Sequence, residues 1–297
     1  MILLSYGMLK NLFKLARPTQ WLKNGVLLAP LVFAGEMSHT LKIELAFAAV
    51  AVFCLLSSAV YTFNDLIDRN YDRQHPLKKE RPLAAGKVTP TQAVVMILIL
   101  LVIALLAAWL INRNFFIIAL VFIGLNLVYS LFLKDIVILD AMSVGLSFVL
   151  RAYAGALAIN VTASTWLLIN TLLLALFLSF GKRRHELVLL EEGAIAHRKI
   201  LGHYSPYLLD QMIGVTTASV VVMYMLYTFS SEVSEKLGTD NLYLTIPFVV
   251  YGIFRYLYLI HKKEKGGSPT TVLITDLPIM LTVLLWVLTS ILILYYA

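Results

Sequence analysis

An apolar run, AFAAVAVFCLLSSAVYTF at residues 46–63, is followed directly by a charged stretch, NDLIDRNYDRQHPLKKERPLAAG at residues 64–86. The run is long enough to cross most of a bilayer as a helix, since about 20 apolar residues span a hydrocarbon core of about 30 Å. The stretch after it places three aspartates among basic side chains at the membrane surface. This boundary predicts a membrane helix that ends in a charged loop.

The whole chain has the composition of a membrane protein. Of its 297 residues, 60% are hydrophobic and 14% charged, and the mean hydropathy is +0.84. Soluble domains average about 45–50% apolar and about 25% charged residues. The single cysteine, Cys54, excludes an intrachain disulfide framework and a multi-cysteine metal site.

The spans are predicted to be helices, because backbone groups in lipid must satisfy their own hydrogen bonds and no alternating barrel pattern is present. The expected fold is all-α, a polytopic bundle of about nine transmembrane helices. We expect one transmembrane domain, 1–297, with an amphipathic cytoplasmic lead-in at 1–17 that carries Lys10, Lys14 and Arg17 at helical spacing. The nine predicted spans are 18–35, 43–65, 91–111, 114–133, 137–159, 164–181, 209–231, 242–260 and 277–296.

Charged residues are distributed unevenly between the two sides of this bundle. Of the 24 Lys and Arg, 19 lie in the N-terminal lead together with Lys23 or in the loops after spans 2, 4, 6 and 8. Three lie in the opposite loops, and Arg151 and Arg255 lie within spans. Basic loops stay in the cytoplasm, so a plasma (inner) membrane protein with a cytoplasmic N-terminus and an external C-terminus is expected. Of the 17 Asp and Glu, 12 share the cytoplasmic side, which topology does not require. Both signs on one face indicate an active surface.

The pattern N-D-x-x-D-x-x-x-D, formed by Asn64, Asp65, Asp68 and Asp72, closes the second span. Steps of three and four residues place the carboxylates on one helical face, where like charges repel. Carboxylate and amide oxygens suit Mg²⁺, which is commonly held by one or two carboxylates together with substrate phosphates. We therefore expect these four residues to bind Mg²⁺ and the three aspartates to be catalytic. The alternative is that the acids only pair with nearby basic residues, which are Arg69, Arg73, Lys78, Lys79 and Arg81.

The motif, its position and the number of spans resemble the UbiA superfamily of intramembrane prenyltransferases. In that family the motif binds a diphosphate through Mg²⁺, and members that prenylate an aromatic ring carry a second aspartate-rich motif after span 6. Here that region reads GKRRHELVLLEEG, residues 181–193, with basic side chains where acids are expected. The departure argues against two metals on one prenyl diphosphate.

Other stretches resemble one branch of this family, represented by decaprenyl-phosphate phosphoribosyltransferase. The resemblance implies an enzyme that transfers 5-phosphoribose from phosphoribosyl pyrophosphate (PRPP) to a polyprenyl phosphate, releases pyrophosphate and serves cell-envelope biosynthesis. The implied partners are PRPP, the lipid and the membrane, with no nucleic acid, and lipid-facing helices would allow a homo-oligomer. The stretches are RPTQWLKN (17–24), RPLAAG (81–86), YSLFLKDIVILD (129–140), LRAYAG (150–155) and GGSPTTVLITD (266–276).

Basic side chains at the cytoplasmic helix ends would hold the phosphates of both substrates. Arg151 lies within the fifth span, where a lone cation costs at least about 2.5–3.5 kcal/mol. It should face the bundle interior and meet an anion, either the lipid phosphate or a carboxylate such as Asp140. The predicted substrate-binding residues are Lys23, Asn64, Arg81, Lys134, Arg151, Lys182 and Arg183.

Two other functions compete with this one. An aromatic prenyltransferase using a polyprenyl diphosphate needs a metal-binding acid cluster after span 6. Glu186, Glu191 and Glu192 lie there without the expected aspartate spacing. A transporter would place substrate ligands at two related positions in broken midmembrane helices, but the sequence has no inverted repeat.

Overall fold

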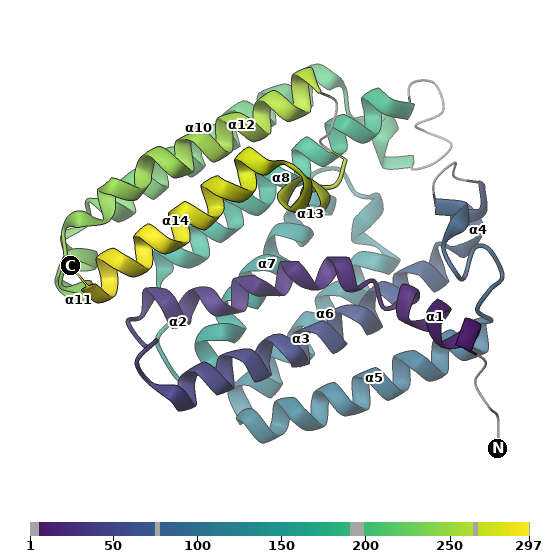
Figure 1. Cartoon of the computed structure of the whole chain (residues 1–297). Helices are drawn as coiled ribbons and strands as arrows, with labels where there is room; N and C mark the ends of the chain where they lie inside the picture. Colours follow the sequence, from purple (N-terminus) through teal and green to yellow (C-terminus); the bar gives the residue numbers. More distant parts are fainter. Residues whose placement is uncertain (1–5, 75–77, 191–198, 264–266, 297) are drawn as a thin grey trace.

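The computed structural model describes residues 6–74, 78–190, 199–263 and 267–296, and within these ranges every regular element is a helix (Figure 1). In chain order the elements are α1 (Tyr6–Leu15), the 3-10 helix η1 (Pro18–Leu28), α2 (Ala29–Phe33), α3 (Thr40–Ile67), α4 (Arg69–Gln74), η2 (Lys78–Glu80), α5 (Pro90–Ile111), α6 (Arg113–Leu131), η3 (Leu133–Asp135), α7 (Leu139–Ala158), α8 (Thr165–Leu190), η5 (Lys199–His203), α10 (Pro206–Thr228), α11 (Ser231–Leu237), η6 (Asn241–Thr245), α12 (Ile246–Lys262), α13 (Pro269–Thr275) and α14 (Leu277–Tyr296).

Eight helical segments of the described chain are long and apolar enough to cross a membrane, and they correspond to the second to ninth predicted spans. The first predicted span, 18–35, is built differently, as η1 continued by α2. Ala29 N–H donates to the carbonyl of Val26 in a 3-10 bond. Pro30 has no N–H for the α-helical bond to that same carbonyl, which explains the tighter winding before it.

Several helices begin where the sequence supplies a capping side chain. Thr89 and Gln92 form a reciprocal capping box at the start of α5, with Pro90 in the first turn. The Asn112 side chain accepts the Phe115 N–H at 2.8 Å and caps α6. These caps satisfy backbone donors that have no intrahelical partner.

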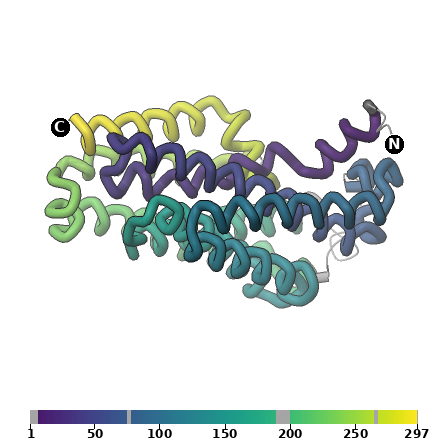
Figure 2. Tube along the Cα trace, turned by 90° about the horizontal axis from the view of Figure 1, so that it is seen from below, coloured from purple at the N-terminus to yellow at the C-terminus, as the bar shows by residue number. Residues whose placement is uncertain are grey.

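Two hydrophobic clusters fill the bundle, and α7 contributes to both. One joins η1, α3, α5, α6 and α7, with the rings of Phe53 and Phe122 5.0 Å apart. The other joins α7, α8, η5, α10 and α12, with Phe177 and Tyr256 5.5 Å apart. Figure 2 shows the helices side by side along one common direction. Among the candidate spans, α3 and α7 have the largest buried shares, so they form the centre of the bundle.

Small side chains let neighbouring elements approach α7 closely. A Cβ atom on Gly155 would lie 2.2 Å from the backbone oxygen of Leu27 in η1. This contact sets the distance between α7 and η1, the two elements that carry Arg151 and Asn24. The buried small residues of α7 are Ala141, Ser143, Gly145, Ser147, Ala152, Ala154, Gly155, Ala156 and Ala158.

The two ends of the bundle differ in what they carry. Helices α1 and α4 lie at one end, and α11 and the last turn of α14 lie at the other, in both views (Figures 1 and 2). Helix α8 continues to Leu190, beyond residue 181 where the sixth span was predicted to end. Lys182 and Arg183 are therefore on a helix rather than in a loop.

Candidate active site

The three aspartates of the motif lie across a break between two helices. Asp65 belongs to the last turn of α3, Asp68 caps its C-terminus, and Asp72 lies in α4. Asp72 N–H still donates to the carbonyl of Asp68 at 2.8 Å, so nearly helical spacing continues through the break. Asp65 and Asp72 are 2% and 4% exposed, which places two carboxylates in a poorly solvated position.

One arginine connects the two buried carboxylates. Arg81 Nη1 lies 3.0 Å from Asp65 Oδ1 and 2.6 Å from Asp72 Oδ2. The loop that carries Arg81 is held by Leu83, which packs against Leu15 of α1. Of the nearby basic residues that could pair with the aspartates, Arg81 therefore does so. We also expected Arg81 to bind phosphate.

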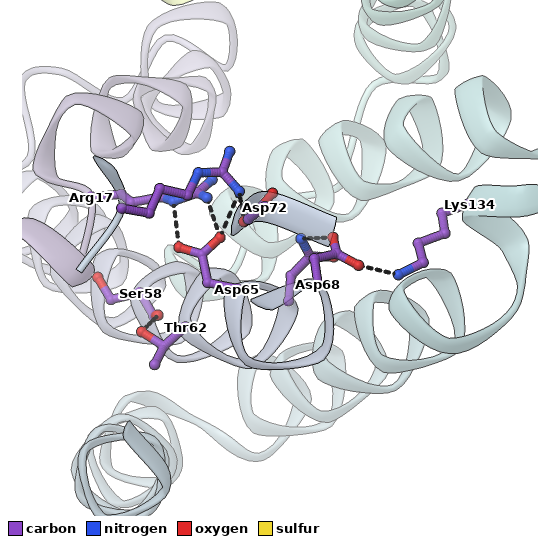
Figure 3. Close-up of polar contacts among 9 residues, drawn as sticks. Arg17, Ser58, Thr62, Asp65, Asp68, Asp72 and Lys134 are labelled. Carbon is purple, nitrogen blue, oxygen red and sulfur yellow. Dashed lines mark hydrogen bonds and ion pairs between the residues drawn. The ribbon is translucent and has the colours of Figure 1, made fainter. Parts of the chain in front are cut away.

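The third aspartate faces another direction. Asp68 accepts from Lys134 Nζ at 2.5 Å and from Asn64 Nδ2 at 2.9 Å. Figure 3 shows Asp65 pointing toward Arg17 and Asp68 pointing toward Lys134. The expectation that all three carboxylates share one face is therefore corrected for Asp68, whereas Asp65 and Asp72 share Arg81. At about 100° per residue, the seven-residue step from Asp65 to Asp72 returns closer to the same face than the three-residue step to Asp68 does.

Arg17 is a member of this cluster that the sequence interpretation placed elsewhere. Its Nε lies 3.1 Å from Asp65 Oδ2, and its Nη2 forms an ion pair with Asp65 Oδ1. The predicted lead-in helix ends at Leu15, and Arg17 adopts a left-handed backbone with φ 53°. The residue before a proline is disfavoured in the right-handed α-helical region, which is consistent with the helix ending before Arg17. The left-handed backbone at Arg17 then directs its side chain to Asp65.

The backbone at Arg17 is fixed by neighbours on α3. Ser58 Oγ lies 2.9 Å from the carbonyl oxygen of Ala16 and accepts the Trp21 Nε1–H at 2.9 Å. A left-handed conformation costs a non-glycine residue about 1–2 kcal/mol, and these bonds offset that cost. The left-handed backbone at Arg17 and the contact of its side chain with Asp65 together fix the position of the guanidinium.

Lys23 and Arg17 flank a single aromatic ring. The Lys23 ammonium lies 5.9 Å and the Arg17 guanidinium carbon 5.6 Å from the centroid of Tyr61, within the range of cation–π contact. Tyr61 lies one helical turn before Asp65 on α3. The region over this ring therefore combines two cations beside the aspartate cluster.

Arg151 faces the interior, as predicted, and is 3% exposed. Its Nε donates to Asn24 Oδ1 at 2.9 Å, and its Nη1 donates to the hydroxyl of Ser147 at 2.8 Å. The guanidinium also lies over the rings of Phe122 and Phe148, at 4.7 and 5.2 Å. The expected contact with Asp140 is not formed, and none of the ion pairs found in the described part of the chain includes Arg151.

Asp140 instead belongs to a second buried cluster. Arg183 Nε lies 2.6 Å from Asp140 Oδ2, and its Nη1 lies 3.2 Å from Glu186 Oε2. Lys182 lies 3.6 Å from Glu186. Tyr204 donates its hydroxyl to Asp140 at 2.8 Å and accepts the Ile138 N–H at 2.7 Å, so it joins the start of α7 to η5. Glu191 and Glu192 lie outside the described residues.

This second cluster supports the segment that presents Lys134. Ile138 has φ 69°, an unusual conformation for a β-branched residue, and lies between η3 and α7. Burial raises the pKa of Tyr204 to about 12 and the Asp140 charge adds to it, while the bond from Ile138 lowers it. The hydroxyl therefore stays protonated at physiological pH and keeps both contacts.

Tyr204→Phe is expected to lower the free energy of unfolding by about 1–3 kcal/mol, because a buried N–H and a carboxylate each lose a partner. The difference from the wild type should be constant below pH 10. It should shrink as the pH rises from 10 towards 12, since a raised folded-state pKa means that deprotonation removes the contribution. Thermal unfolding in detergent across this range measures it. A difference independent of pH would contradict the role of the hydroxyl.

Metal ligation would depend on the first cluster. Among the described residues, no group of three or more His, Cys, Asp or Glu side chains is arranged as a metal site. The donor chemistry nevertheless fits Mg²⁺, because carboxylate oxygens of Asp65 and Asp72 both face the position of one nitrogen, Arg81 Nη1. Asn64, Asp65, Asp68 and Asp72 would hold the ion once the basic groups move.

The predicted residues therefore fall into separate groups. Side-chain contacts join Asp65, Asp72 and Arg81 in one group and Asn64, Asp68 and Lys134 in a second, which the backbone bond from Asp72 to Asp68 links to the first. Lys23 lies at Tyr61. Arg151 lies in a neutral polar group with Asn24, and Lys182 and Arg183 lie in the Asp140 group. The sequence interpretation missed Arg17, Tyr61 and Tyr204 as site residues. Only Arg17 had a local signal, its position directly before a proline.

Several phosphoribosyltransferases and a prenyltransferase are similar to this chain in sequence. The chain is 32% identical to decaprenyl-phosphate phosphoribosyltransferase of Mycolicibacterium smegmatis, covering 95% of this chain and 91% of that protein. It is 33% identical to the protein of the same name from Corynebacterium glutamicum, covering 96% and 85%. A 4-hydroxybenzoate octaprenyltransferase from Actinobacillus pleuropneumoniae is 32% identical over 38% of this chain and 39% of that protein.

The fold is shared with a solved structure. The UbiA homolog from Archaeoglobus fulgidus bound to DMAPP and Mg²⁺ superposes with a TM-score of 0.72 at 18% identity, covering 97% of this chain and 100% of that chain. The sequence profile of the UbiA prenyltransferase family matches residues 25–275. With the helical bundle and the aspartate motif in place, the profile and the relatives lead to one conclusion: the chain belongs to the UbiA prenyltransferase family.

Proposed function

We propose that the protein transfers 5-phosphoribose from PRPP to a polyprenyl phosphate and releases pyrophosphate. The supporting observation is the extent of similarity: phosphoribosyltransferases match along 95% of the chain, whereas the octaprenyltransferase matches along 38%. The whole chain acts as one transferase unit in a multi-pass membrane protein. The aspartate end, with the N-terminus, faces the cytoplasm of the plasma membrane.

The chain's residues divide the work of binding two anionic substrates. Asn64, Asp65, Asp68 and Asp72 would hold Mg²⁺, and a bound Mg²⁺ would supply charge neutralisation for the diphosphate of the donor. Arg81 and Lys134 bind the phosphates of the donor beside the metal, and the cations near Tyr61 extend that positive surface. Lys182 and Arg183 bind further phosphate groups at the end of α8. Arg151 attracts the acceptor phosphate through its positive charge, which is buried within the bundle.

The transfer itself needs no protein nucleophile. An oxygen of the acceptor phosphate forms a bond to the anomeric carbon of the ribose, and the bond from that carbon to the diphosphate breaks. The electron pair of the broken bond leaves with pyrophosphate. The acceptor phosphate is already ionised near neutral pH, so no side chain has to remove a proton. The side chains contribute by orienting both substrates and excluding water.

Purified protein with Mg²⁺, decaprenyl phosphate and radiolabelled PRPP is expected to move label into the organic phase. EDTA should abolish the transfer, and added Mg²⁺ should restore it, because the diphosphate depends on the metal for charge neutralisation. Reactions without the lipid serve as the control. Absence of labelled lipid, with turnover of a polyprenyl diphosphate and an aromatic acid instead, would show an aromatic prenyltransferase.

A further inference from the structure

Arg17 makes the most specific polar contact in the aspartate cluster. Its planar guanidinium addresses both oxygens of Asp65, through Nε at 3.1 Å and through Nη2 (Figure 3). This two-point geometry suits a carboxylate and a phosphate equally well. The Arg17 side chain is 23% exposed, whereas that of Asp65 is 2% exposed, so the arginine is the partner that has room to move.

The contact uses the oxygens that a metal ion needs. Asp65 Oδ1 is shared by Arg17 and Arg81, and Arg81 Nη1 also contacts Asp72. A Mg²⁺ ion bound to Asp65 would lie within about 2.1 Å of its oxygen and requires near-octahedral geometry. The two guanidinium groups make three contacts with this carboxylate, which has about four lone-pair positions, and they place two positive charges where the cation would bind. Metal binding at Asp65 therefore favours departure of at least one guanidinium.

The charges of the cluster favour exchange of partners over loss of a partner. Three carboxylates are matched by three basic side chains, which are Arg17, Arg81 and Lys134. A divalent cation arriving alone would leave displaced cations without counter-charge in a poorly solvated region, which is unfavourable. A metal arriving with a diphosphate brings new anionic oxygens for the displaced guanidinium groups. The cluster is thus matched to a metal–diphosphate pair.

The surroundings of Arg17 indicate where its new partner would lie. The guanidinium and the Lys23 ammonium both lie over Tyr61, at 5.6 and 5.9 Å from the ring centroid. The two cations make the surroundings of this ring positively charged, which favours an anion there. Ser58 holds the backbone before Arg17 through Ala16, so the side chain turns while its attachment point stays fixed.

We propose that Arg17 is a donor-binding residue that exchanges Asp65 for the diphosphate of the donor when the metal binds. Asp65 holds the guanidinium beside the site until the metal takes over its oxygens. The exchange makes metal and diphosphate bind cooperatively, each tightening the other by the same factor. The proposal rests on the proposed function only in taking the donor to be a diphosphate.

The test measures Mn²⁺ binding to the full-length protein in detergent by electron paramagnetic resonance, with and without inorganic pyrophosphate. Corrections are made for the Mn²⁺–pyrophosphate complex in solution. In Arg17→Gln, Mn²⁺ alone should bind about tenfold tighter, because the metal no longer displaces the guanidinium. Pyrophosphate at saturating Mn²⁺ should bind about tenfold more weakly, because it loses a charged donor. The two affinities thus move in opposite directions.

Two further variants separate exchange from a structural role. Lys14→Gln removes an equal charge from the exposed face of α1 and should change neither affinity. Ser58→Ala keeps every charge but loosens Arg17, and should shift both affinities in the same directions as Arg17→Gln, by less. Unchanged Mn²⁺ affinity in Arg17→Gln, or a parallel loss of both ligands, would overturn the proposal. Neither readout requires phosphoribosyl transfer, so opposite shifts without labelled lipid would refute the proposed function alone.

Discussion

Asp65→Asn should reduce transfer by about a thousandfold, because a metal ion supplies several kcal/mol of charge stabilisation and each 1.36 kcal/mol is a factor of ten in rate. The amide keeps the size of the side chain and one accepting oxygen. It removes the negative charge that Arg17, Arg81 and the metal share. Rates with labelled PRPP and a polyprenyl phosphate measure the effect, and Mn²⁺ binding should fall with them.

The fold should survive this change. The side chains of Arg17 and Arg81 are 23% and 26% exposed, so both can find water when the carboxylate is gone. Asp135→Asn is the matched control, since this exposed aspartate lies on η3 next to Lys134 and should leave the rate unchanged. Near-full activity in both Asp65→Asn and Asp68→Asn would remove the metal site from the mechanism.

The fold was largely predictable because its signals are local. Eight apolar runs became candidate spans, and the capping box at Thr89 and Gln92 places the start of α5 where the sequence turns apolar. The winding of η1 depends on Pro30, which a count of apolar residues does not register. The end of α8 was misplaced because charged residues were interpreted as a loop, although Lys182 and Glu186 lie four residues apart and form an ion pair along the helix.

The site was predictable only in part, because its chemistry depends on contacts between distant segments. The aspartate motif is contiguous and lies at the end of α3 as predicted, but Asp68 faces Lys134 rather than the partner shared by Asp65 and Asp72. The partners of the aspartates come from residues 17, 81 and 134, and no spacing rule relates these positions. Likewise, Asp140 forms its ion pair with Arg183 rather than with Arg151 because α7 packs against α8. Tertiary structure decides such pairings.

Gly155→Ala is expected to destabilise the protein by about 2–3 kcal/mol and to disturb the site from within the bundle. The new methyl group would lie 2.2 Å from the backbone oxygen of Leu27, and a backbone atom cannot turn aside as a side chain can. Arg151 lies about one turn before Gly155 on α7, and Asn24 lies about one turn before Leu27 on η1. Separation of η1 from α7 would therefore break the hydrogen bond from Arg151 to Asn24. Thermal unfolding followed by the fluorescence of the four tryptophans, of which Trp21 lies on η1, measures the change.

Gly124→Ala provides the matched control, because a Cβ atom at this α6 position meets nothing within 4 Å. It should leave the unfolding temperature and the transfer rate close to those of the wild type. A lower unfolding temperature in Gly155→Ala with unchanged transfer would show that the contact of η1 with α7 serves stability alone. Loss of both would show that the same backbone contact fixes Asn24 and Arg151 for the acceptor. Equal behaviour of the two variants would contradict the close approach itself.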